Sequence, residues 1–118
     1  MKRIRVILIA LTQMLREMIT QAGDREPDLE IVRDYPPTVD FAAAVTESKA
    51  AVVIARADAC DPATVRRTLG KSPWVKIVAI TDDARQISLY ELTVRRRDLG
   101  DLSPTQLLAA IRAAAKEG

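Results

Sequence analysis

Short runs of aliphatic and β-branched residues alternate along this chain with segments that carry helix-start signals. Three such runs cover 4–10, 50–55 and 74–81, and each is short enough to be a strand that is buried on both faces. Between them, Thr12 can cap one helix, and Asp61 followed by Pro62 marks the start of another. This alternation predicts an α/β domain built on a parallel sheet.

The other predicted elements complete the alternation. We expect a helix over 13–22, a short strand over 29–32 and a helix over 38–48. Ser103-Pro-Thr-Gln106 is a capping box that opens a final helix, ending near 116. The apolar positions of the first and last helices are expected to face the core: Met14, Leu15, Met18, Ile19 and Ala22 in the first, Leu107, Leu108, Ile111 and Ala115 in the last. No interdomain linker or repeat is evident, so 1–118 is interpreted as a single domain.

The segment 82–102 departs from this regular pattern. Apolar and polar residues alternate with period two over 87–95, and Thr, Val, Tyr and Ile favour a strand over a helix there. We therefore expect extended chain over 87–95, with the preceding helix of a regular alternation missing or shortened to a turn. Asp82-Asp83 is interpreted as a turn signal rather than as a cation site.

Composition excludes several classes of function. The net charge of +2 is too small to imply nucleic-acid binding by itself. The chain has no histidine, which removes the commonest metal ligand and the usual acid–base group. Its single cysteine, Cys60, fits a reducing cytoplasm, and no apolar run approaches the length of a membrane span. No nucleophile–base pair and no cofactor-binding motif is visible, so we expect neither an enzyme nor a cofactor.

Three segments resemble the receiver domains of response regulators, of the kind that precede LuxR/NarL-type DNA-binding domains. They are Ile4-Arg-Val-Ile-Leu-Ile-Ala-Leu-Thr-Gln-Met-Leu-Arg-Glu17, Trp74-Val-Lys-Ile-Val-Ala-Ile-Thr81 and Leu99-Gly-Asp-Leu-Ser-Pro-Thr-Gln-Leu-Leu-Ala-Ala-Ile-Arg112. The resemblance implies a flavodoxin-like, three-layer αβα fold. Its five-stranded parallel sheet would have the strand order 2-1-3-4-5.

The resemblance also implies a degenerate phosphorylation pocket. Receivers bind Mg²⁺ with paired acids after the first strand, and they phosphorylate an aspartate after the third strand. By this correspondence Ala10 and Leu11 replace the paired acids, and Arg56 replaces the phosphoacceptor. Thr81 matches the hydroxyl position of the family, whereas Gly100 stands at the position of its lysine. The chain is therefore expected to bind no Mg²⁺ and to accept no phosphoryl group.

Two other readings of this pocket stay open. Asp58 lies two residues past Arg56, so a displaced register would make it the phosphoacceptor. Alternatively, Arg56 and Thr81 would bind an anion or a small ligand at the strand ends. The simpler interpretation is that Arg56 pairs with Asp58 or Asp82 at the surface.

The leading functional hypothesis is a non-catalytic, receiver-like regulatory domain that works by protein–protein contact, as a homodimer or with another protein partner. The candidate interface is Tyr90, Leu92, Val94 and Arg96, in the region through which receivers commonly meet partners. Ile87 and Leu89 would lie on the opposite face of the same extended segment. Arg95-Arg96-Arg97 is interpreted as a solvated edge rather than as a nucleic-acid site.

Overall fold

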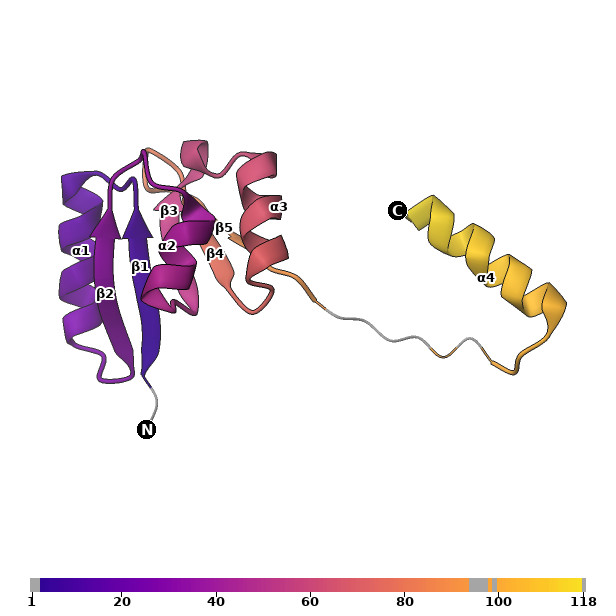
Figure 1. Ribbon diagram of the computed structural model, residues 1–118. Helices are drawn as coiled ribbons and strands as arrows, with labels where there is room; N and C mark the ends of the chain where they lie inside the picture. Colours follow the sequence, from indigo (N-terminus) through magenta and orange to yellow (C-terminus); the bar gives the residue numbers. More distant parts are fainter. Residues whose placement is uncertain (1–2, 94–97, 99, 118) are drawn as a thin grey trace.

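The computed structural model describes residues 3–93, 98 and 100–117. A five-stranded sheet with strand order β2-β1-β3-β4-β5 forms its centre (Figure 1). The strands are β1 (Ile4–Ile9), β2 (Leu29–Tyr35), β3 (Val52–Arg56), β4 (Lys76–Ile80) and β5 (Ile87–Tyr90). The helices are α1 (Gln13–Asp24), α2 (Phe41–Ser48), α3 (Pro62–Lys71) and α4 (Pro104–Glu117), and a 3₁₀ turn, η1, spans Ala57–Ala59. The predicted α/β class and strand order are confirmed.

The direction of the last strand differs from the prediction. β1 to β4 are mutually parallel, whereas β5 pairs antiparallel with β4, so the sheet is mixed. The reason lies in the connection, because only the turn over 81–86 separates β4 from β5. A parallel strand needs a crossover of a dozen or more residues, which a turn of this length cannot provide. The predicted loss of the intervening helix is thus confirmed, as is extended chain over 87–90.

Local sequence signals explain the ends of the helices. The Thr12 side chain accepts a hydrogen bond from the Leu15 backbone N–H at 3.3 Å and caps α1. Asp40 caps α2 in the same way through Ala43, and Asp61 caps α3 through Thr64. Each of these caps satisfies a backbone donor that the helix cannot satisfy internally.

The two faces of the sheet are covered unequally. On one face, α2 and α3 enclose a core of strand and helix residues that includes Ile7, Val53, Ile77, Phe41 and Val45, all buried. On the other face, α1 packs over β1 and β2, where Val6, Leu8 and Leu15 are buried. No described helix covers this second face over β4 and β5 (Figure 1).

The expected burial of the last helix is wrong for this structure. α4 lies well away from the sheet (Figure 1), and Leu107, Leu108 and Ile111 are 50%, 51% and 56% exposed. The Cα radius of gyration is 18.4 Å, against about 13.5 Å for a compact chain of this length. Met14 and Met18 of α1, also predicted to be in the core, are exposed as well. In both helices, apolar side chains expected in the core are therefore exposed to solvent.

Candidate functional site

The carboxyl ends of β1, β3 and β4 meet at one edge of the sheet, where parallel α/β proteins place their ligands. Ala10 and Leu11 follow β1 there, and both are buried. Ala10 has a left-handed backbone with φ of 61°, and its N–H donates to the Tyr35 carbonyl at 3.1 Å. Neither of these two side chains offers an oxygen, so this part of the edge is apolar.

Arg56 is the last residue of β3, and two carboxylates from the adjoining loops surround it. Its Nε donates to Asp58 Oδ1 at 2.7 Å and lies 3.6 Å from Asp82 Oδ1. The η1 turn brings Asp58 back toward the strand end. The hydrogen bond from Arg56 to Asp58 and the charge of that carboxylate raise the pKa of Arg56 above its ordinary value. The interpretation of Arg56 as an ion-paired residue is therefore confirmed, with both partners present.

Thr81 is committed to the turn that follows β4. Its hydroxyl donates to Asp83 Oδ1 at 2.6 Å, and its oxygen accepts from the Gln86 N–H at 3.1 Å. Asp83 also accepts from the Arg85 N–H at 3.1 Å. The Thr81 hydrogen bond, followed by that of Arg85, lowers the pKa of Asp83. The prediction that Asp82-Asp83 belongs to a turn is confirmed, because both residues lie within it.

The polar groups at this edge largely satisfy one another. A surface hollow of about 480 Å³ lies beside them, lined by Thr81, Asp82, Asp83, Arg85 and Gln86. Its carboxylates would repel an anion, and the guanidinium of Arg56 already has two acidic neighbours. Within the described part of the chain, no three acidic, Cys or His side chains converge into a group that could hold a metal. The geometry here suits structural ion pairing better than ligand capture.

Cys60 lies just beyond η1 and is buried. Burial, reinforced by the nearby carboxylates of Asp58 and Asp61, raises the pKa of its thiol to about 11. Its Sγ donates weakly to the Arg56 carbonyl at 3.5 Å. A protonated, enclosed thiol is a poor nucleophile, so Cys60 acts here as a small apolar residue.

The other predicted site residues are not gathered at this edge. Gly100 lies in the connection to α4 and lines a small hollow with Leu102 and Leu107, whereas Arg56 lies at the end of β3. Tyr90 and Leu92 are exposed at and after the end of β5. Val94 and Arg96 lie outside the described residues, as do Arg95 and Arg97.

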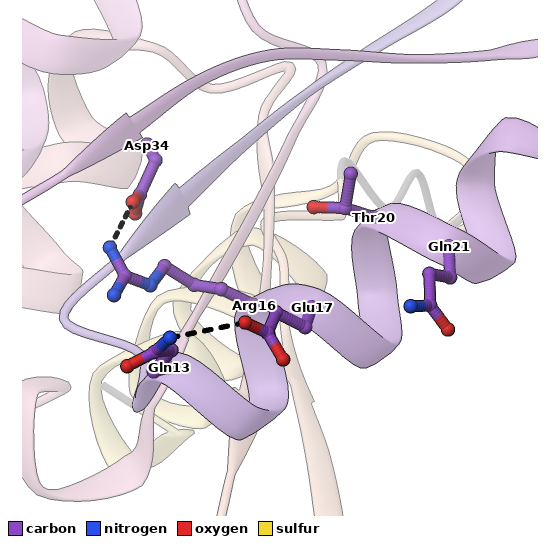
Figure 2. A pocket seen from close by; sticks show the side chains of 6 residues that line it. All are labelled: Gln13, Arg16, Glu17, Thr20, Gln21 and Asp34. Carbon is purple, nitrogen blue, oxygen red and sulfur yellow. Dashed lines mark hydrogen bonds and ion pairs between the residues drawn. The ribbon is translucent and has the colours of Figure 1, made fainter.

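Sequence reasoning did not identify a second hollow, of about 460 Å³, along α1 and β2. Figure 2 shows its lining: Gln13, Arg16, Glu17, Thr20, Gln21 and Asp34. Arg16 Nη1 contacts Asp34 Oδ2 at 2.6 Å, and Gln13 Nε2 donates to Glu17 Oε1 at 3.1 Å. The spacing of Gln13 and Glu17 by four residues could have signalled the second contact. Arg16 and Asp34 pair between α1 and β2, and Gln13 and Glu17 pair along α1, so four of the lining side chains already have a partner.

Comparisons with protein-family models, with curated proteins and with solved structures found no match. Within the described residues, no helix is long and apolar enough to cross a membrane.

Proposed function

We propose that this chain is a non-catalytic, receiver-like regulatory domain that acts through protein–protein contact and without phosphorylation. The observation that carries the proposal is the ion-paired Arg56 at the end of β3, with buried, apolar Ala10 and Leu11 beside it. The guanidinium of Arg56, which pairs with Asp58 and Asp82, occupies the place where a phosphoacceptor carboxylate would be needed. The location we propose is the cytoplasm.

The chemistry of phosphoryl transfer supports this reading. An aspartate accepts a phosphoryl group only when a metal ion or other cations offset the charge that develops on the transferring group. The nearest carboxylates, Asp58 and Asp82, both contact Arg56, and the first strand contributes no acid. An alternative acceptor at Asp58 would have to release Arg56 and still lack carboxylate ligands for the metal after β1.

The exposed surfaces of the molecule support a role in contact. β5, α1 and α4 all present large apolar side chains to solvent, among them Ile87, Leu89, Met14 and Leu108. Contiguous exposed apolar surface on a water-soluble domain commonly marks an interaction site. At the carboxyl ends of β1, β3 and β4, by contrast, the described side chains are apolar or already paired, which does not favour a catalytic site.

The test is incubation of the full chain with acetyl phosphate and Mg²⁺, followed by intact mass measurement under conditions that preserve acyl phosphates. We expect no mass gain of about 80 Da for the natural chain. We also expect none for Arg56→Asp, because restoring one acid leaves Ala10 and Leu11 unable to bind the metal. A stoichiometric adduct on an aspartate of the natural chain would overturn the proposal. An adduct that maps to Asp58 would replace it with the displaced-acceptor reading.

A further inference from the structure

An uncovered apolar surface extends across three strands on the α1 side of the sheet. The strand registers pair Ile54 with Val78 and Val78 with Leu89, so these three side chains form a row across β3, β4 and β5. Ile87 lies beside this row, opposite Ile80. Ile87 and Leu89 are 73% and 55% exposed, whereas Ile54 and Val78 are half-buried. We call Ile54, Val78, Ile87 and Leu89 the open face.

Helix α1 borders the open face on one flank. Arg16 lies on the side of α1 that faces β2, because it contacts Asp34 of that strand. At about 100° per residue, Met14 and Met18 lie on the opposite side of the helix, toward β3. Both methionines are exposed, and methionine adapts its shape to an incoming apolar surface. We refer to the open face together with the exposed Met14 and Met18 as the trough.

Ion pairs limit the trough at both ends of the strands. Lys76 Nζ contacts Glu91 at 3.2 Å where β4 begins, and Arg56 lies 3.6 Å from Asp82 where the neighbouring strands end. An apolar centre within a polar rim is the usual anatomy of a protein interface. The trough therefore fits an apolar helix face better than a charged ligand.

The C-terminal helix presents a matching surface. Leu107, Leu108 and Ile111 lie at positions i, i+1 and i+4, which places them on one face of α4, and all three are exposed. Ser103 caps the helix by accepting a hydrogen bond from the Gln106 N–H at 3.1 Å. A capped helix of 14 residues is still only marginally stable in water without tertiary packing. α4 thus needs an apolar surface to pack against.

Helix α4 does not pack on the sheet of its own chain, since its apolar side chains are exposed. None of the described residues between β5 and α4 belongs to a helix or strand, and Gly100 there has φ of 90°, which favours glycine. Figure 1 shows α4 clear of the sheet. An open subunit of this kind, with an unsatisfied element and an unsatisfied surface, is the form that exchanges elements between two copies.

We propose that α4 of one copy docks in the trough of a second copy, and that the exchange is reciprocal. Such a two-fold pair would cover both troughs and both α4 helices at once. This inference rests on the proposed function, since it names the partner in protein–protein contact as a second copy of this chain.

The first experiment measures the mass of the full chain by light scattering coupled to size exclusion. We expect a particle of two chains for the natural protein. Ile111→Glu, at the centre of the apolar stripe of α4, and Leu89→Glu, on the open face, should each weaken dimerisation at least about a hundredfold by placing a charge in an apolar contact. Ala113→Glu adds the same charge on the opposite side of α4 and should remain dimeric. A natural chain of single-chain mass, or a dimer that neither Ile111→Glu nor Leu89→Glu weakens, would overturn the inference.

A second experiment separates exchange from docking within one chain. Mixing Ile111→Glu with Leu89→Glu should restore dimers, because the intact α4 of the second variant meets the intact trough of the first. In the double variant Leu89→Cys and Ile111→Cys, oxidation should join two chains, whereas cross-linking confined to single chains would overturn the exchange. The buried Cys60 should not interfere. The phosphorylation assay is independent, so an unphosphorylated monomer would defeat this inference alone, whereas phosphorylation would defeat the proposed function.

Discussion

The two halves of the sheet contain similar residues in different surroundings. In β1 and β3, Ile7, Ile9 and Val53 are fully buried under α2 and α3, and Leu8 is buried under α1. In β5, every residue is exposed, including Ile87 and Leu89. The hydrophobicity of a strand therefore does not determine whether it belongs to the core. The covered half forms the buried core, whereas the open half leaves apolar side chains exposed.

The largest expected effect is on the free energy of unfolding of the covered half. Ile7→Ala should lower it by about 2–5 kcal/mol, because a tightly packed site cannot fully collapse around the lost methyl groups. Leu89→Ala, measured at a protein concentration low enough to keep chains apart, should lower it by less than about 1 kcal/mol. Urea denaturation of both variants checks this difference. Equal losses would show that the open half is as tightly packed as the covered half.

Thiol reactivity distinguishes the halves in a second way. Burial and the raised pKa of Cys60, about 11, keep its thiol protonated near neutral pH. We expect alkylation of Cys60 in the folded chain to be more than about tenfold slower than in denaturant. In Leu89→Cys, the added thiol on the open face should react rapidly in the monomer and serves as the internal control. Rapid labelling of Cys60 would mean that the region around η1 opens readily.

Removal of helix caps compares a packed helix with an unpacked one. Thr12→Ala should lower the free energy of unfolding by about 1 kcal/mol, since the N–H of Leu15 loses its acceptor and α1 is packed on the sheet. Ser103→Ala removes the equivalent cap of α4. It should reduce the helical signal in circular dichroism with little change in the urea transition of the monomer. A large shift of the urea midpoint for Ser103→Ala would contradict this prediction, because it would show that α4 unfolds together with the sheet.

The smallest expected effect concerns acid stability. Hydrogen bonds from the Thr64 hydroxyl and N–H lower the pKa of Asp61, and those from Thr81 and Arg85 lower the pKa of Asp83. The folded chain therefore binds fewer protons than the unfolded chain near the ordinary value of 3.8. Their stabilisation is present above that pH and is lost as the pH falls through the lowered folded values.

Urea transitions at about pH 5 and about pH 3 measure this dependence. Asp61→Asn and Asp83→Asn should each flatten it slightly. The control is Asp28→Asn, whose side chain has no hydrogen bond or ion pair with any other described residue. If the free energy of unfolding fell as the pH was raised from about 3 to about 5, the lowered pKa values of Asp61 and Asp83 would be contradicted.

The candidate site was only partly predictable from the sequence. The pairing of Arg56 with Asp58 and Asp82 could be foreseen, because the residues are close in sequence or follow adjacent parallel strands. The hollow along α1 and β2 could not, since Arg16 and Asp34 meet only through the placement of α1 on the sheet. The exposure of Met14 and Met18 also depends on how α1 is placed on the sheet. Periodicity defines an apolar face but not how much of it a neighbour will cover.

The sequence by itself determined the presence of the four helices and the first four strands, and the caps at Thr12, Asp61 and Ser103, because periodicity and capping depend on residues only a few positions apart. The full length of β2 and the cap at Asp40 were not predicted. The sequence also excluded a helix between β4 and β5. The prediction of a parallel fifth strand was wrong, because the short 81–86 turn requires β5 to run antiparallel to β4. Only the tertiary structure decided the position of α4. Burial of Leu107, Leu108 and Ile111 depends on which surface lies within reach of the connection, and an amphipathic pattern is the same whether that surface belongs to the same chain or to another.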